Sequence, residues 1–292
     1  MMETLLRGAP VRDAIDGEIK LRVKELKAEG CDPMVATFRI GDDDGEQYYE
    51  KAVIKRASEY GFDCKVVVLP EDVSQEEAEA ELRALNEDAR IHGILMLMPF
   101  PKSIDSDALT SLLSPEKDID AITDASYSNL FTNKKDGFFA CTAESCMEIL
   151  RHYDVDLKGK HVVIVGRSLR VGKPLLMMML NANATVTVCH SRTKEGDLRR
   201  ALYNADIVVL ATGLTEYYGP EFFRDGQIII DVGTGRGKDG KMAGDFDSKS
   251  WEQDKDPEHL CYTPVPGGVG TVTTTLLLRN VVKAAERKQR NQ

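Results

Sequence analysis

Short apolar runs alternate with helical stretches along the whole chain, and this alternation constrains the fold more than any other feature of the sequence. The runs predicted to be strands are 35–41, 64–70, 93–99, 160–166, 185–189, 206–212, 227–232 and 262–265. The stretches predicted to be helices are 47–60, 74–89, 144–153 and 273–287, and residues 101–142 are predicted to be rich in loops. Nearly continuous apolar strands separated by helices are typical of parallel sheets that are covered on both faces. The predicted fold class is therefore α/β.

The chain is long enough for two such domains. It has 292 residues, and one domain takes roughly 150 residues. Hydrophobic residues make up 42% and charged residues 29%, which allows a sizeable core and excludes disorder as the main state. We place the boundary between the two domains near residues 140–160.

The charge balance argues against nucleic acid or an anionic membrane as a partner. Lys and Arg number 38 and Asp and Glu 48, so the formal net charge is −10, whereas such partners normally need a basic face. The apolar run 93–100 is far shorter than the ~20 residues that span a bilayer, and residues 1–20 contain no signal-peptide core. The cysteines share no framework spacing and the histidines form no metal-ligand pairs. We therefore expect a cytoplasmic protein with reduced thiols, no metal site and no membrane contact.

The strongest local signal is a strand that runs into a glycine turn and then into a helix, over residues 161–174. Such a turn lets the backbone approach a pyrophosphate at the N-terminus of the helix. Only Gly166 and Gly172 are present, so the spacing departs from G-x-G-x-x-G. A Walker A loop is excluded because Lys173 is followed by Pro174, which has no hydroxyl group for Mg²⁺. A tight turn without a ligand is the alternative interpretation.

The end of the next strand indicates which dinucleotide the turn would take. An NAD site usually has Asp or Glu about 20 residues further on, to hold the ribose 2′-OH. Here the strand 185–189 is followed by His190-Ser191-Arg192-Thr193, with no carboxylate before Glu195. Together with Arg167 in the turn, these side chains suit a 2′-phosphate, so we predict NADP. The alternative is that Arg192 simply points into solvent.

Several motifs then occur in chain order. They are Gly166-Arg167-Ser168, Val171-Gly172-Lys173-Pro174, Cys189-His190-Ser191, Asp231-Val232-Gly233, Gly244-Asp245 and Thr263-Pro264-Val265-Pro266-Gly267-Gly268-Val269-Gly270. Lys117-Asp118-Ile119-Asp120 and Pro99-Phe100-Pro101 add to them in the N-terminal half. Together they resemble the methylenetetrahydrofolate dehydrogenase/cyclohydrolase family, and the resemblance extends over residues 41–280.

The resemblance implies two α/β domains. A parallel folate-binding domain would comprise residues 1–142, completed by a C-terminal helix over 271–292, and a Rossmann-like NADP-binding domain would comprise residues 143–270. It also implies a homodimer that oxidises 5,10-methylenetetrahydrofolate with NADP⁺. The residues expected at the cofactor are Gly166, Arg167, Ser168, Gly172, Ser191, Arg192 and Thr234. Those expected at the folate are Tyr49, Val53, Leu97, Asp120, Pro266, Gly267, Gly268, Val269 and Gly270, with Tyr49 and Asp120 as catalytic residues.

Two positions depart from the family pattern. Counting back from Gly61 in the pattern Tyr-x-x-x-Lys places the family's catalytic lysine at Val53, and the family's glutamine before Pro-x-Pro corresponds to Leu97. Hydride transfer mainly needs the two reactants to be positioned. Hydrolysis of the methenyl cation needs an activated water and proton transfer, which valine and leucine do not provide. We therefore predict a dehydrogenase with weak or lost cyclohydrolase activity.

Other interpretations remain open. The chain could be a full bifunctional enzyme, a catalytically inactive folate- or nucleotide-binding homologue, or a dehydrogenase of another small substrate. For Asp120, helix capping is the alternative to folate binding.

Overall fold

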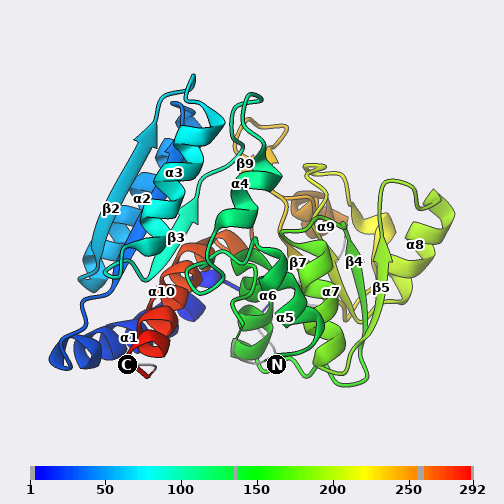
Figure 1. Cartoon of the computed structure of the whole chain (residues 1–292). Coiled ribbons are helices and arrows are strands. Elements are labelled where there is room, and N and C mark those ends of the chain that lie inside the picture. Colours follow the sequence, from blue (N-terminus) through cyan, green and yellow to red (C-terminus); the bar gives the residue numbers. More distant parts are fainter. Residues whose placement is uncertain (1–3, 135–136, 255–259, 291–292) are drawn as a thin grey trace. The chain divides into compact units, whose positions relative to one another are not determined.

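The computed structural model describes residues 4–134, 137–254 and 260–290 of the chain. Its contacts divide the chain into two compact units, each with a parallel sheet (Figure 1). We call residues 14–141 and 274–292 the small-sheet unit, and residues 1–13 and 142–273 the large-sheet unit.

The small-sheet unit contains a three-stranded parallel sheet in the order β2-β1-β3. Its strands are β1 (Met34–Ile40), β2 (Asp63–Leu69) and β3 (Gly93–Met96). Its helices are α2 (Asp44–Tyr60), α3 (Gln75–Glu87), α4 (Ser106–Leu112) and α5 (Asp124–Phe131), with most of α1 (Gly8–Ala28) and α10 (Thr273–Arg290). A capping box opens α3, because the Ser74 hydroxyl accepts from the Glu77 N–H and the Glu77 side chain accepts from the Ser74 N–H.

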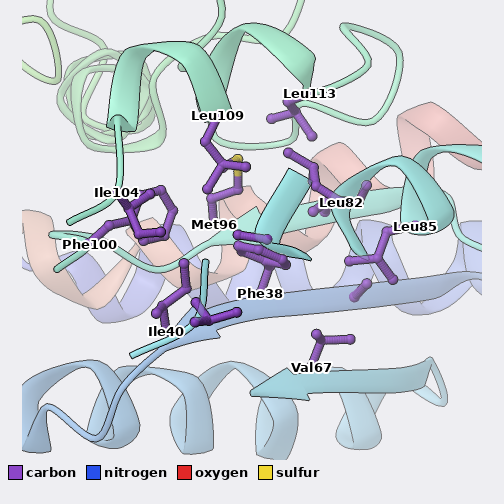
Figure 2. Packing of buried hydrophobic residues seen from close by; sticks show 14 of the residues in the cluster. Phe38, Ile40, Val67, Leu82, Leu85, Met96, Phe100, Ile104, Leu109 and Leu113 are labelled. Atoms are coloured by element: carbon purple, nitrogen blue, oxygen red, sulfur yellow. The ribbon is translucent and has the colours of Figure 1, made fainter. Parts of the chain in front are cut away.

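One face of this sheet carries the apolar core that Figure 2 shows. Phe38 and Met96 from the strands meet Leu82 from α3 and Leu109 from α4, and all four are buried. Alternate residues of a strand point to opposite faces, so Thr37 and Arg39 of β1 point to the other face. That second face is where the polar side chains of α2 reach the sheet.

The large-sheet unit contains a five-stranded parallel sheet in the order β10-β7-β6-β4-β5. Its strands are β4 (His161–Val165), β5 (Thr185–Cys189), β6 (Ile207–Leu210), β7 (Ile228–Asp231) and β10 (Cys261–Tyr262), and a separate antiparallel pair is β8 (Gly235–Arg236) with β9 (Met242–Ala243). Its helices are α6 (Cys141–His152), α7 (Gly172–Asn181), α8 (Glu195–Asn204) and α9 (Ser248–Asp254), with short 3₁₀ turns at Pro220–Phe222 and Val269–Thr271. Because β5 and β6 flank β4, the strand order reverses at β4.

The predicted α/β class with parallel sheets is confirmed, and the structure adds three features that were not predicted. Residues 101–142 contain the helices α4 and α5 rather than loops alone. The helix α1 was not predicted, although its buried residues recur at helical spacing. The segment before residue 14 packs with the large-sheet unit, where the Leu6 N–H donates to the Tyr262 carbonyl at 2.8 Å.

Candidate active site and cofactor site

The helix α2 carries the first two predicted substrate residues. It begins after Asp43, whose side chain accepts from two backbone N–H groups, and it ends at Gly61, which has a left-handed φ of 80°. Tyr49 is partly buried and Val53 is fully buried. Residues four apart lie next to each other on a helix, so these two side chains are neighbours on α2.

The lysines that flank Val53 do not share its position. Both Lys51 and Lys55 are exposed, whereas Val53 is 0% exposed. A helix turns by about 100° per residue, so residues two apart leave it on different faces. Neither lysine therefore stands in the place of Val53.

Leu97 follows β3 and is also buried, at 4% exposed. Its N–H donates to the Phe38 carbonyl at 2.9 Å, and the pairing of Thr37 with Leu95 continues the register so that Leu97 lies beside Arg39. A cis Met98–Pro99 bond follows. Leu97 thus lies on the sheet face that α2 covers.

That face also contains a buried polar cluster that the sequence reasoning missed. The Thr37 hydroxyl donates to Glu50 Oε1 at 2.6 Å, and Arg39 Nε donates to Glu50 Oε2 at 3.3 Å. Arg39 also pairs with Asp42 at 3.1 Å. Burial raises the pKa of Glu46, whose Oε2 has no hydrogen-bond partner among the described residues. The helical spacing of Glu46, Glu50 and Val53 could have predicted this cluster. It was overlooked because the helix was predicted to start at residue 47, after Glu46.

The segment that leads to Asp120 is tied to several elements of the small-sheet unit. Lys117 Nζ donates to three carbonyls at the end of α3, at 2.7 to 3.1 Å. The fully buried Asp118 carboxylate accepts from the backbone N–H groups of Ile122 and Thr123, and from the hydroxyls of Thr123 and Ser126. These four hydrogen bonds are 2.7 to 2.9 Å long. The backbone on both sides of Asp120 is therefore held firmly.

Asn280 of α10 completes this arrangement, and the sequence reasoning missed it. Its Nδ2 donates to the Ile119 carbonyl at 2.8 Å, and Cys141 Sγ donates to the same carbonyl at 3.6 Å. The partly buried Asp120 comes next, followed by Ala121 with a left-handed φ of 55°. The helix-capping alternative for Asp120 was wrong, because Thr123 is the N-cap of α5.

The glycine turn after β4 has the geometry that a dinucleotide site needs. A Cβ on Gly166 would collide with the Ala211 carbonyl, and one on Gly172 would collide with the Gly166 carbonyl. The strand, the turn and α7 can therefore pack this closely only with glycine at both positions. Arg167 and Ser168 are exposed, and the first residues of α7 have no side-chain cap. The Lys173 N–H donates to the Ser168 carbonyl at 3.0 Å and Pro174 has no N–H group, so a phosphate would be held by the exposed turn and the dipole of α7.

The other predicted cofactor residues lie at the same edge of the large sheet. Val165 pairs with Cys189, so the exposed residues Ser191 and Arg192 follow β5 beside the glycine turn. The His190 ring accepts from the Arg192 N–H at 3.1 Å, which gives it a part in this turn. Thr234 is exposed and lies beyond the end of β7, with β6 between β7 and β4.

The predicted substrate residues are divided between the two units. Tyr49, Val53, Leu97 and Asp120 belong to the small-sheet unit, whereas the loop 266–270 belongs to the large-sheet unit. In that loop a cis Val265–Pro266 bond precedes Gly267, whose φ is 107° and whose carbonyl accepts from the Gly8 N–H at 2.8 Å.

The described residues contain neither a metal-binding cluster nor a membrane-spanning helix. In that part of the chain, no group of three or more His, Cys, Asp or Glu side chains is arranged to hold a metal ion. None of the described helices is both long and apolar enough to span a bilayer.

A parallel sheet with a glycine turn at its strand-order reversal defines a dinucleotide-binding α/β protein. The family models narrow this class. The tetrahydrofolate dehydrogenase/cyclohydrolase NAD(P)-binding domain matches residues 140–289, and the catalytic domain of the same family matches residues 6–120. The chain belongs to the tetrahydrofolate dehydrogenase/cyclohydrolase family.

Relatives and solved structures agree with this assignment over the full length. A bifunctional protein FolD of Clostridium perfringens is 42% identical over 97% of this chain and 99% of its own. The crystal structure of the bifunctional enzyme FolD of Campylobacter jejuni is 35% identical, with a TM-score of 0.92 over 97% of this chain and 99% of its own. A Trypanosoma brucei FolD, described as complexed with NADP cofactor and inhibitor, is 33% identical, with a TM-score of 0.89 over 99% of both chains.

Proposed function

We propose that this chain is an NADP-dependent 5,10-methylenetetrahydrofolate dehydrogenase with weak or no cyclohydrolase activity. Membership of the family and the glycine turn at Gly166 support the dehydrogenase. The complete burial of Val53, where the resemblance places the lysine, carries the second part of the proposal. The names of the relatives favour the bifunctional alternative, because they are described as dehydrogenase and cyclohydrolase together.

The residues around the glycine turn support NADP as the cofactor. NADP⁺ would supply the hydride acceptor. The exposed turn before α7 and the dipole of that helix would hold its pyrophosphate, and the exposed Arg167, Ser191 and Arg192 would hold the 2′-phosphate. No carboxylate lies at the end of β5 to repel that phosphate before Glu195. The NADP-bound relative from Trypanosoma brucei is consistent with this assignment.

In the proposed reaction the protein positions the folate rather than moving protons. Asp120 accepts hydrogen bonds from the amino-pterin ring, and Asn280 and Asp118 fix the backbone that presents it. Tyr49 on α2 and the loop 266–270 contact the rest of the folate. Removal of a hydride from the methylene bridge leaves a nitrogen-stabilised cation and releases no proton, so positioning is sufficient for this step.

Hydrolysis of that cation makes a demand that Val53 and Leu97 cannot meet. A water must be activated and protons moved, and such acid–base assistance is worth about 10²- to 10⁴-fold. Both side chains are apolar and buried. Lys51 and Lys55 are exposed and do not replace the missing lysine.

We also propose that the chain forms a homodimer, as the resemblance implies. The edge strand β2 supports this, because Val66 and Val68 on one of its faces are 47% and 46% exposed. An apolar edge strand is a site for pairing with another chain. The molar mass from light scattering tests it: twice the chain mass supports a dimer and a single chain mass contradicts it.

Restoring the missing pair tests the proposed loss of hydrolysis. We expect Val53→Lys with Leu97→Gln to accelerate the decay of added methenyltetrahydrofolate above that of the unmutated protein. Val53→Lys alone should not do so, because a buried lysine without a partner is desolvated and unoriented. Leu95→Gln with Val53→Lys is the matched control, since Leu95 is buried two residues earlier on the same face of the sheet. Equal rates for the two double variants would contradict the assignment of Leu97.

A further inference from the structure

Two buried aspartates lie at the carboxyl ends of β6 and β7, and the reaction described above does not use them. Asp231 is the last residue of β7 and is 2% exposed, and Asp245 is 0% exposed. Asp231 Oδ1 accepts from the backbone N–H groups of Gly233 at 2.9 Å and of Asp245 at 3.1 Å. Asp231 Oδ2 accepts from the Phe246 N–H at 2.9 Å. The two carboxyl groups therefore belong to one hydrogen-bonded corner.

Asp245 connects this corner to the residues that follow β6. Its Oδ2 accepts from the Thr212 N–H at 2.7 Å, the Thr212 hydroxyl at 2.8 Å and the Gly213 N–H at 3.1 Å. Three donors on one oxygen are typical of an ionised carboxylate, which can only accept. Gly213 is exposed, so the buried charge lies directly beneath the surface of the sheet edge.

The corner is built around two glycines and lacks a counter-charge. A Cβ on Gly233 would collide with Asp245 Oδ1, and a Cβ on Gly244 would collide with Asp231 Oδ2. In the described parts of the chain, Asp245 Oδ1 has no hydrogen-bond partner and neither aspartate forms an ion pair. A buried charge without a counter-ion is costly, and it is therefore a candidate for a functional role.

The neighbouring lysine does not neutralise the pair. Lys249 lines a cavity of about 60 Å³ beside Asp231, but its Nζ is held by Glu216 at 3.2 Å and Asp239 at 2.9 Å. Burial, and to a lesser extent the nearby Asp245, raise the pKa of Asp231 to about 7 against the lowering effect of its backbone hydrogen bonds. Asp231 therefore resists ionisation until the pH rises to about 7.

The position of the pair relates it to the cofactor. In a doubly wound sheet a dinucleotide crosses the carboxyl edge where the strand order reverses. That reversal is at β4. The half of the dinucleotide bound along β4 and β5 carries the 2′-phosphate, so the nicotinamide half lies over the ends of β6 and β7.

We propose that Asp231 and Asp245 form a buried anionic pair that makes the site prefer the positively charged nicotinamide of NADP⁺ over the neutral ring of NADPH. The preference follows from Coulomb attraction, which is strong where water is excluded. It rests on the proposed function, because it assumes that a nicotinamide cofactor binds at this edge.

The full-length variant Asp245→Asn tests this directly. Asparagine keeps the shape and one carbonyl oxygen that can accept from Thr212 and Gly213, while it removes the charge. The Kd values of NADP⁺ and NADPH are measured by calorimetry at pH 8, without folate. We expect the ratio Kd(NADP⁺)/Kd(NADPH) to rise about 3- to 10-fold, with the Kd of NADPH nearly unchanged. Asp154→Asn is the control, because it removes the same charge from an exposed turn of the same unit and should leave the ratio unchanged.

Equal weakening of both cofactor forms would overturn the proposal and leave only a structural role for Asp245. If Asp245→Asn does not fold, Asp231→Asn removes the other carboxyl group and should move the ratio in the same direction. The same ratio is measured with NAD⁺ and NADH. A shift seen only with NAD⁺ and NADH supports the anionic pair and contradicts the choice of NADP as cofactor. The absence of binding of all four cofactors contradicts both the anionic pair and the proposed function.

Discussion

Asp118 and Asp245 are both fully buried, each in its own unit, yet their carboxylates are satisfied very differently. Both oxygens of Asp118 are occupied, by four donors from the start of α5 and the turn before it. Asp245 accepts three hydrogen bonds at Oδ2, whereas its Oδ1 has no donor among the described residues. The carboxyl group of Asp231 lies beside it. The protein's own donors thus satisfy the carboxylate of Asp118, which supports the loop that presents Asp120. At the edge of the large sheet, by contrast, negative charge is left over for a ligand.

The largest expected effect is on the free energy of unfolding, which should respond differently to substitution of a buried aspartate in each unit. Asp118→Asn turns an acceptor into a donor that faces other donors, and it should lower the free energy of unfolding by about 3 kcal/mol or more. At pH 8, Asp231→Asn should lower the free energy of unfolding by less than Asp118→Asn does. The pKa of Asp231 is raised on folding, from 3.8 to about 7, so its contribution to stability falls as the pH rises through this range. Denaturant unfolding at pH 5 and pH 8 checks both variants.

The deficit of Asp231→Asn should therefore shrink between pH 5 and pH 8, while that of Asp118→Asn should not. A deficit of Asp231→Asn that grows with pH would show that its carboxylate is stabilised rather than strained.

The next effect concerns activity in the small-sheet unit. Asp120→Asn should lower kcat/KM for methylenetetrahydrofolate by roughly 100-fold, because hydrogen bonds to a charged group are worth about 1.5–3 kcal/mol. The Kd of NADP⁺ and the melting temperature should hardly change. Asp124→Asn, an exposed acid four residues later, is the matched control. Full activity of Asp120→Asn would remove Asp120 from the site.

In the large-sheet unit, Arg167→Ala should weaken NADP⁺ by about 10- to 150-fold through the loss of one charge-assisted phosphate contact. NAD⁺ lacks that phosphate and should bind as before. Lys160→Ala is the control, because Lys160 is exposed at the opposite end of β4. A titration with each cofactor checks the prediction, which fails if both cofactors weaken together.

The smallest expected effect tests whether Asn280 positions the segment that carries Asp120. Asn280→Ala removes the donor to the Ile119 carbonyl, and we expect KM for the folate to rise about 3- to 10-fold for the loss of one hydrogen bond. The Kd of NADP⁺ should not change. A fall in kcat without a change in KM would indicate that Asn280 acts on the chemical step and not on the position of Asp120.

The sequence predicted what depends on local pattern. The strands and the long helices follow from apolar runs and caps, and the glycine turn follows from the spacing of Gly166 and Gly172. The helix α1 was missed although Val11, Ile15 and Ile19 recur at helical spacing, because Gly17 and the absence of a capping signal weaken that pattern.

What the sequence could not predict are contacts between distant segments. Asn280 lies 161 positions from the Ile119 carbonyl that it binds. Asp118 and Asp120 look alike in the sequence, and only the position of α5 makes the first structural and leaves the second partly exposed. The aspartates of the large sheet are likewise distinguished by the donors around them and not by their neighbours in the chain.

The decay of added methenyltetrahydrofolate tests the proposed activity most directly. The unmutated protein is mixed with this cation without NADP⁺, and its absorbance is followed beside a buffer blank. The same preparation must reduce NADP⁺ when methylenetetrahydrofolate is supplied. We predict decay at the rate of the blank together with rapid NADPH formation. Decay clearly above the blank would contradict the loss of cyclohydrolase activity and make Lys51 and Lys55 the first residues to mutate.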